Sequence, residues 1–329
     1  MRIVVAGGGG VGGYVAGRLT EAGHAVTLFC RGRTYEIVRR RGIALEDPLG
    51  LRRIRPAVIT DDPSTLWSAP GPELLMLCVK SWQVSKVSIS LLPYVGDNTV
   101  AVTIQNGVTA SETAAAILGA GRVLAGAFML IAEQTQPGVY RRSDGPFAVE
   151  LGPSKAEDPV PEFKAQRVVR LLREIGFATT LSADIHPILW RKLAFAASIG
   201  GVSALHRLPP GDARTRPDID SQIRAGICEA IEIAKAEGVR VDESDVARII
   251  GEYEKLPAGM TSSMYRDIEA GRPSELLELS GEIVIRALSN GIPAPIHSAI
   301  IDQLVDKEKH ARELRRSSEE ALFNNAPSV

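Results

Sequence analysis

The chain has 329 residues, of which 45% are hydrophobic and 23% charged, and its formal net charge is −1. This balance is typical of a globular protein of two domains and excludes a fibrous or disordered chain. Because 38 basic residues nearly balance 39 acidic ones, no global field would attract nucleic acid or an anionic membrane. We therefore expect a small molecule as the partner, and a second copy of the chain, in a homodimer, is the other candidate.

The three cysteines, Cys30, Cys78 and Cys228, lie far apart and form no CxxC pair. Neither a disulfide framework nor a metal site is predicted, and a reducing cytoplasm fits this usage. The N-terminus lacks the continuous apolar centre of a signal peptide, and no stretch reaches the roughly 20 apolar residues that span a bilayer. We expect a cytoplasmic protein without a membrane partner.

The chain begins with a short apolar run, residues 2–6, that is typical of a buried parallel strand. Six of the next seven residues, 7–13, are glycines. Apolar residues then recur at helical spacing as far as Gly23, and residues 25–29 form a second apolar run. The order is strand, glycine-rich turn, helix and strand.

Within this turn, Gly7, Gly9 and Gly12 match the GxGxxG pattern of dinucleotide-binding proteins. The first glycine permits the tight turn, the second lets the backbone approach a pyrophosphate, and the third lets helix and strand pack closely. With Gly10 and Val11, the turn is predicted to hold the cofactor at the helix N-terminus. The alternative is a glycine-rich turn that binds no ligand.

The end of the second strand indicates which dinucleotide binds. NAD enzymes place an acidic residue there, but this chain reads LFCRGR, with Arg31 and Arg33 and no acid before Glu36. A guanidinium pairs well with a 2′-phosphate, so the sequence favours NADP(H), with Arg31 as the contact nearest the strand end. The alternative is a pair of solvated loop arginines.

Two later strands are each followed by a polar residue. Residues 74–79 and 99–104 read as buried strands, and Lys80 and Asn106 follow them. Ligands of open parallel sheets bind beyond the carboxyl ends of the strands, so both residues are candidates for ligand contact. Either could instead satisfy local backbone groups.

The remaining pattern divides the chain into two domains. Residues 122–151 are strand-like around a PGVY turn, 163–175 form an amphipathic helix and 178–181 a last strand, so the α/β domain is expected to span 1–183. Residues 184–316 are expected to be helical, and the tail 317–329 is expected to fray. The predicted helices of this second domain are 184–199, 218–237, 243–255, 274–288 and 295–312.

A lysine lies in the apolar stripe of the first of these helices. Ile188, Lys192, Phe195, Ala196 and Ile199 share one face at helical spacing. Desolvation there would lower the pKa of the lysine ammonium and make it a better proton donor near neutrality. The alternative is a lysine at the rim of the stripe, with its stem packed and its head in water.

Two other segments carry polar side chains. Ser263 belongs to a run of hydroxyl residues, and Glu275 begins a helix. Glu275, Glu278 and Glu282 recur at helical spacing, which by itself is typical of a solvated face.

Taken together, these segments resemble the ketopantoate reductases, also called 2-dehydropantoate 2-reductases, over nearly the whole chain. The matching motifs are GGGGVGG with Arg31, VKSWQV, IQNGV, LWRKL, TSSMYRDIEAGRPSE and NGIPAP. The resemblance implies a Rossmann-type domain, a C-terminal helical domain and an active site in the cleft between them.

The resemblance also implies roles for individual residues. Lys192 takes the position of the catalytic lysine, which hydrogen-bonds the substrate ketone and protonates the alkoxide. Glu275 matches the acidic residue that holds that site in order. Asn106 and Lys80 match residues that line the nicotinamide and substrate region, and Ser263 matches a hydroxyl that binds the substrate carboxylate.

The sequence departs from pantoate-forming members at three positions, where asparagines are replaced by Ala196, Gly200 and Pro210. A more apolar pocket is expected. The predicted function is NADPH-dependent reduction of a small 2-oxo acid to the 2-hydroxy acid, by default 2-dehydropantoate to (R)-pantoate in pantothenate biosynthesis. The alternatives are reduction of a related keto acid, or a non-catalytic sensor that binds NADP(H).

Overall fold

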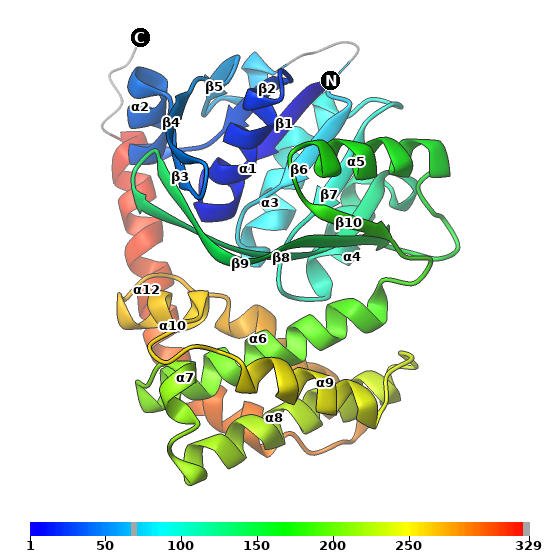
Figure 1. Cartoon of the computed structure of the whole chain (residues 1–329), viewed down its shortest axis with the longest axis vertical. Coiled ribbons are helices and arrows are strands. Elements are labelled where there is room, and N and C mark those ends of the chain that lie inside the picture. Colours follow the sequence, from blue (N-terminus) through cyan, green and yellow to red (C-terminus); the bar gives the residue numbers. More distant parts are fainter. Residues whose placement is uncertain (67–70, 325–329) are drawn as a thin grey trace. The chain divides into compact units, whose positions relative to one another are not determined.

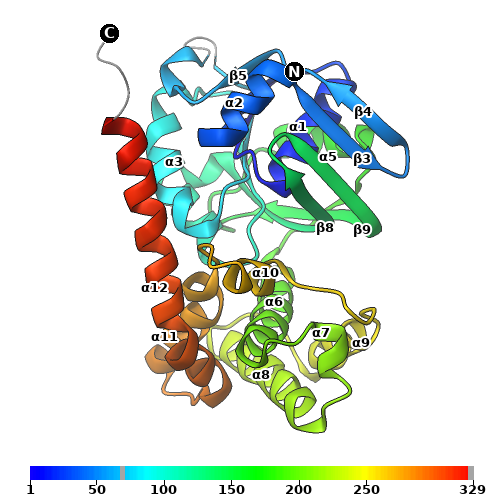
Figure 2. The same cartoon turned by 90° about the vertical axis from the view of Figure 1, so that its left-hand side faces the viewer.

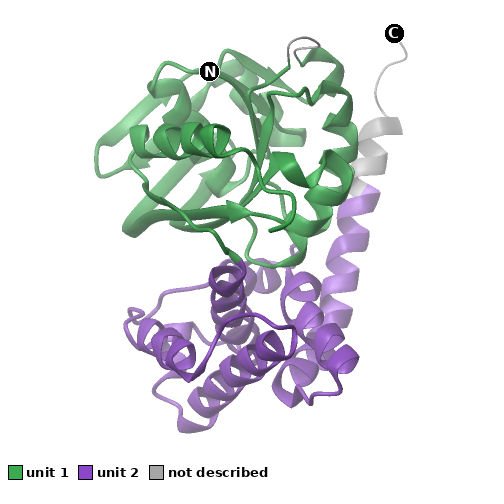
Figure 3. Ribbon diagram, turned by 90° about the vertical axis from the view of Figure 1, so that its right-hand side faces the viewer, with its two compact units in different colours: residues 1–185 green, residues 186–329 purple. Residues whose placement is uncertain are grey.

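The computed structural model describes residues 1–66 and 71–324, with side chains as far as Ser317. The chain divides into two compact units, 1–185 and 186 onward, which Figure 3 shows in different colours. Unit 1 combines a β-sheet with helices, whereas the regular elements among the described residues of unit 2 are all helices. The predicted fold class, an α/β domain followed by a helical domain, is confirmed.

The sheet of unit 1 runs in the order β4-β3-β9-β8-β7-β6-β1-β2-β5, and β10 pairs with β9 (Figure 1). Its centre is parallel, whereas β8 with β9 and β3 with β4 are antiparallel hairpins. The strands are β1 (Arg2–Ala6), β2 (Ala25–Phe29), β3 (Ile43–Asp47), β4 (Gly50–Ile54), β5 (Val58–Thr60), β6 (Leu74–Leu77), β7 (Val100–Thr103), β8 (Val123–Gln136), β9 (Val139–Pro153) and β10 (Ala178–Leu181).

Apolar side chains cover both faces of this sheet, as its parallel strands require. In β1, Ile3 and Val5 belong to a core cluster that includes residues of α1 and α5. Val4 and Ala6 point to the other face, into a cluster that includes residues of α3 and α4. The helices of unit 1 are α1 (Gly10–Glu21), α2 (Gly32–Arg41), α3 (Val84–Leu91), α4 (Thr109–Leu118) and α5 (Glu162–Glu174), with 3₁₀ turns η1 (Pro63–Thr65), η2 (Ser81–Gln83), η3 (Leu92–Tyr94) and η4 (Ala120–Arg122).

The core of unit 2 is α6, which contacts α8, α9, α10 and α12; its pairing with α8 can be followed in Figure 2. Among the described residues, α6 is the one helix long and apolar enough to cross a membrane, with a mean hydropathy of 1.3, and 67% of that stretch is buried. The elements are α6 (His186–His206), α7 (Pro210–Ala213), α8 (Pro217–Ala236), α9 (Glu243–Glu254), α10 (Ser263–Glu269), the π-helix η5 (Leu277–Gly281), α11 (Glu282–Asn290) and α12 (Pro295–Asn324).

The C-terminal helix is longer than expected. The predicted helix ends at residue 312, but α12 continues to Asn324. No glycine or proline interrupts the helix before Pro327, so the backbone can keep its hydrogen bonds. Residues 325–329 lie outside the described part of the chain.

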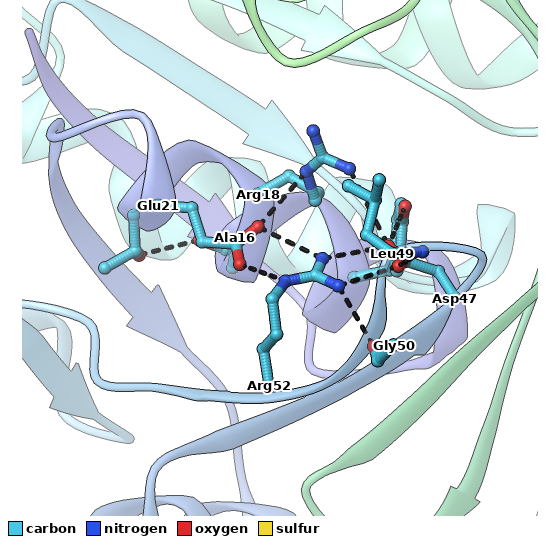
Figure 4. Close-up of polar contacts among 9 residues, drawn as sticks. Ala16, Arg18, Glu21, Asp47, Leu49, Gly50 and Arg52 are labelled. Carbon is cyan, nitrogen blue, oxygen red and sulfur yellow. Dashed lines mark hydrogen bonds and ion pairs between the residues drawn. The ribbon is translucent and has the colours of Figure 1, made fainter.

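A cluster of ion pairs around the buried Asp47 side chain connects α1 to the β3–β4 hairpin (Figure 4). The Asp47 carboxylate, 1% exposed, accepts hydrogen bonds from both terminal nitrogens of Arg52 at 2.8 and 3.0 Å and from the Tyr14 hydroxyl at 2.8 Å. Arg52 also bonds Glu21 of α1. Burial by itself would raise the pKa of Asp47, but the hydrogen bonds from Arg52 and Tyr14 outweigh it and hold that pKa well below its usual range.

Replacing Asp47 by asparagine is expected to destabilise the protein by about 2 kcal/mol at pH 7, because the hydrogen bonds that Arg52 and Tyr14 donate to a charged group are weakened or lost. The carboxylate contributes this stability above its unfolded pKa of about 3.9, and the contribution is lost as the pH falls through the lower folded pKa. Thermal unfolding followed by circular dichroism should therefore show wild type and variant converging below about pH 4. A stability difference that stayed the same from pH 7 to pH 3 would contradict this assignment.

Candidate active site

The glycine-rich turn has the geometry that its sequence predicts. Gly7 has φ +121°, and a Cβ there would lie 2.4 Å from the Cys78 carbonyl oxygen. A Cβ at Gly12 would lie 2.1 Å from the Gly7 carbonyl oxygen, so helix and strand could not pack with any side chain at this position. At Gly9 a Cβ would meet nothing within 4 Å. The open space is therefore beside the glycine that is expected to face a pyrophosphate, and these residues fit a dinucleotide.

The first turn of α1 supplies donors for an anion. Gly9 is the N-cap of α1, and no side chain caps the helix. The first backbone N–H groups of a helix have no partner within it, and the helix dipole favours negative charge at this end. This turn, which includes Gly10 and Val11, can therefore accept a phosphate group.

Arg31 lies two residues after Phe29, the last residue of β2. It is exposed, and its guanidinium lies 5.5 Å from the centroid of the Phe29 ring. The next residue, Gly32, has φ +59° and begins α2. Stacking on an aromatic ring leaves the guanidinium edge available for hydrogen bonds, which suits contact with a phosphate.

The structure places Lys80 and Asn106 at the same edge of the sheet, because β6 and β7 are parallel neighbours. Both residues are partly buried. Gln105, which sequence reasoning missed, fixes the two loops: its Nε2 donates to the carbonyl oxygens of Leu77 and Val79 at 2.7 and 2.8 Å. The ends of both strands are thus held by one buried amide.

In unit 2, Lys192 lies in the second turn of α6 and is partly buried. Burial lowers the pKa of its ammonium group to about 8, while the Glu275 carboxylate acts in the opposite direction. Lys192 is therefore charged at neutral pH but releases its proton more readily than an ordinary lysine. This combination suits a general acid.

Glu275 is 7% exposed and precedes a π-helix, so the predicted continuous helix over 274–288 is wrong in this part. The solvated face expected for the glutamates is also wrong. Glu278 bonds Arg312, and Glu282 bonds Arg286, at distances of 2.7–3.0 Å. Arg312 lies 34 residues after Glu278, so helical spacing did not reveal that pair, whereas Arg286 lies four residues after Glu282 on α11.

A buried cluster from α12 holds the backbone on both sides of Glu275. The carboxylate of Glu308, 2% exposed, accepts from the Ser274 N–H at 3.0 Å and from the Ser274 hydroxyl at 2.6 Å. Arg312 then bridges Glu308, at 2.6 Å, to Glu278 at 2.8 and 3.0 Å. The chain is thus held at Ser274, one residue before Glu275, and at Glu278, three residues after it.

Ser263 is the first residue of α10 and is exposed. Its neighbour Ser262 is the N-cap of that helix and accepts from the Tyr265 N–H at 3.0 Å. Because capping occupies Ser262, the structure leaves Ser263 as the exposed hydroxyl at this helix end. The packing of α10 on α6 places it in the same unit as Lys192.

Residues 3–156 match the family model described as ketopantoate reductase PanE/ApbA, and residues 184–308 match the model of its C-terminal region. The chain belongs to the ketopantoate reductase family. It is 30% identical over 304 residues to the 2-dehydropantoate 2-reductase of Halobacterium salinarum. The aligned residues cover 92% of this chain and 97% of that protein. Identity to the 2-dehydropantoate 2-reductase of Vibrio cholerae is 27% over 94% of this chain and 98% of that protein.

Solved structures agree with this family. A PanE/ApbA family ketopantoate reductase from Ralstonia eutropha has a TM-score of 0.84 at 25% identity, covering 95% of this chain and 100% of that one. D-mandelate dehydrogenase with NADH and anilino(oxo)acetate has a TM-score of 0.85 at 19% identity, covering 95% and 99%, which shows a shared fold. The chain is a 2-dehydropantoate 2-reductase-like oxidoreductase.

In this member of the family, the three positions that lack asparagine have little polar character. Gly200 is buried, and a Cβ there would lie 2.9 Å from Met264 Cε and 3.2 Å from Ser262 Oγ. Pro210 is buried in the first turn of α7, and Ala196 is partly buried on α6. An asparagine at 200 would need Met264 to move, so α10 itself fills the space of that side chain.

Proposed function

We propose that the protein reduces a small 2-oxo acid to the 2-hydroxy acid with NADPH. The observation that carries the proposal is the partly buried Lys192, whose ammonium has a pKa of about 8 and a buried carboxylate, Glu275, acting on it. When bound, the nicotinamide cofactor supplies the hydride. Reduction of a carbonyl then requires a donor at the oxygen on which negative charge develops, and a positioned ammonium stabilises that charge and supplies the proton.

The remaining candidate residues have supporting roles in this proposal. The pyrophosphate would be held by the glycine-rich turn, at Gly7, Gly9, Gly10, Val11 and Gly12. In the same proposal, Lys80 and Asn106 would bind the nicotinamide end and the substrate, and Ser263 would donate to the substrate carboxylate. Glu275 would keep Lys192 protonated until substrate is bound.

We assign the cofactor as NADPH because Arg31 follows β2 where NAD enzymes carry an acid. Replacing Arg31 by alanine is expected to weaken NADPH binding roughly 10- to 100-fold, the effect of losing a hydrogen bond to a charged group. NADH binding should change less than about twofold. Titration of cofactor fluorescence would measure both constants. Arg40→Ala, an exposed arginine further along α2, is the matched control, and equal losses for both dinucleotides in Arg31→Ala would make Arg31 merely structural.

The default substrate is 2-dehydropantoate, the substrate named for the relatives from Halobacterium and Vibrio. A second candidate is a 2-oxo acid with a more apolar side chain. This candidate is supported by the three positions without asparagine: Ala196, Pro210 and Gly200, which Met264 adjoins. None of them has a side-chain amide that could form a hydrogen bond with a substrate hydroxyl. The similarity in fold to D-mandelate dehydrogenase adds aromatic 2-oxo acids to those worth testing.

NADPH oxidation measured against a panel of 2-oxo acids tests the function and the substrate together. The panel should contain 2-dehydropantoate, its analogue without the 4-hydroxyl group, and benzoylformate. Oxidation with at least one of them is expected. Cofactor binding without oxidation of any would instead favour the non-catalytic sensor.

We also propose a cytoplasmic location and a homodimer. The free cysteines Cys30, Cys78 and Cys228 support a reducing compartment. A relative of similar fold, from Staphylococcus aureus, is described as a dimeric ketopantoate reductase. Analytical ultracentrifugation would test the oligomeric state.

A further inference from the structure

Gly10 and Gly13, two glycines of the first turn that lie outside the GxGxxG pattern, are crowded by the chain itself. A Cβ at Gly10 would lie 2.5 Å from the carbonyl oxygen of Ala132, and a Cβ at Gly13 would lie 2.0 Å from the Tyr140 ring. Ala132 and Tyr140 belong to β8 and β9, the long antiparallel hairpin of unit 1. These glycines therefore make room for the hairpin, which packs directly against the first turn of α1.

The hairpin places two hydrogen-bond donors on this turn. Gln134 and Tyr140 are opposite each other across β8 and β9, at an irregularity in the register between Gln134 and Gln136. The Tyr140 hydroxyl donates to the Gly8 carbonyl oxygen at 3.0 Å, and Gln134 Nε2 donates to the same oxygen at 3.2 Å. Tyr140 is fully buried, and burial raises the pKa of its hydroxyl, so it remains a neutral donor.

The Gly8 carbonyl has a direct bearing on ligand binding. It shares one peptide plane with the Gly9 N–H, so fixing the oxygen also fixes the direction of that N–H group. A peptide between two glycines rotates easily unless it is held. The two donors therefore keep the Gly9 N–H from turning away, beside the open space that a Cβ at Gly9 would enter.

Gln134 also reaches the start of α2. Its Nε2 lies 3.1 Å from the Thr34 hydroxyl oxygen, and Thr34 is three residues after Arg31. One amide group therefore touches the turn expected to hold the pyrophosphate and the segment expected to hold the 2′-phosphate. No such contact extends from the Tyr140 hydroxyl to α2 among the contacts of the described residues.

We propose that Gln134 and Tyr140 are positioning residues for the dinucleotide: together they fix the Gly8–Gly9 peptide, and Gln134 alone couples it to the start of α2. The assignment rests on the proposed function, because it presumes a dinucleotide on this turn and NADP(H) specificity from Arg31. Neither residue needs to touch the cofactor.

Cofactor binding to Gln134→Met and Tyr140→Phe tests this assignment, since both variants remove a donor and keep most of the side-chain volume. Each is expected to raise the Kd for NADPH about fivefold, the usual effect of one lost hydrogen bond. The Kd for NADH should rise equally in Tyr140→Phe but less in Gln134→Met, so that only the glutamine variant loses preference for NADPH. Without cofactor, both should show faster hydrogen exchange at the amides of residues 8–13.

Tyr14→Phe is the matched control, because it removes a buried tyrosine hydroxyl of the same unit that bonds Asp47 instead. It should lower the melting temperature and leave both dissociation constants within about twofold. Unchanged NADPH binding in both Gln134→Met and Tyr140→Phe, with a wild type that binds NADPH, would overturn the positioning assignment alone. A wild type that bound neither dinucleotide would overturn the proposed function as well.

Discussion

Replacing Lys192 by methionine is expected to lower kcat at least about a hundredfold and to leave the Kd for NADPH within about twofold. Methionine keeps the length and apolar packing of the stem on α6 but removes the ammonium. The loss of one donor at a developing oxyanion typically costs about 3 kcal/mol of barrier. Cofactor binding is spared because, in the proposed function, the dinucleotide rests on the glycine turn of unit 1.

Stopped-flow measurement of NADPH oxidation gives the rate constant, and cofactor fluorescence gives the dissociation constant. Lys309→Met, on an exposed part of α12, is the matched control and should behave as wild type. Turnover within a few-fold of wild type in Lys192→Met would remove Lys192 from the mechanism. Loss of NADPH binding together with turnover would point to misfolding instead, which circular dichroism would detect.

Replacing Glu275 by glutamine is expected to move the alkaline limb of the pH profile to lower pH. The reaction requires protonated Lys192, so wild-type kcat should be constant at low pH and fall as the pH rises through about 8. The Glu275 carboxylate raises the pKa of Lys192 against the effect of burial. Without this charge, burial lowers that pKa further, less lysine is protonated, and kcat at pH 8 should fall about tenfold.

The pH dependence of kcat from pH 5.5 to 9.5, measured at saturating substrate and NADPH, tests this directly. Glu282→Gln is the matched control, because Glu282 pairs with Arg286 and no effect of it on Lys192 is expected. The control should leave the alkaline limb where wild type has it. An alkaline limb that stayed in place in Glu275→Gln would show that this carboxylate does not set the protonation of Lys192.

Much of the fold follows from local patterns in the sequence. The bounds of β1 and β2 are those that the apolar runs predict, because a parallel strand buried on both faces needs a short continuous apolar segment. The predicted bounds of β10 are also confirmed, although this strand is only partly buried. The GxGxxG turn was identified from its spacing. Contacts with Cys78, next to the adjacent strand, require the glycine at position 7, and a contact with the Gly7 carbonyl oxygen requires the glycine at position 12.

Other helices and strands could not be predicted from local sequence patterns. The sequence patterns did not predict two helices, α2 and α4, or three small strands, β3, β4 and β5. In α2, arginines outnumber apolar residues, and only Val38 is buried, so the helix has little apolar periodicity to detect. The predicted end of the last helix at residue 312 was also wrong, since backbone hydrogen bonds continue α12 to Asn324 without needing apolar side chains.

The sequence alone determined the fold class, the family and the residue types available for chemistry, because periodicity and motif spacing are local properties. Only the tertiary structure decided how the glutamates after Pro273 are used: Glu275 acts on Lys192, while Glu308 and Arg312 hold the backbone beside it. It likewise decided that Gln134 and Tyr140 reach Gly8, more than 120 residues earlier in the chain. A buried polar group needs a partner wherever the fold provides one, and that partner is chosen by packing rather than by distance along the sequence.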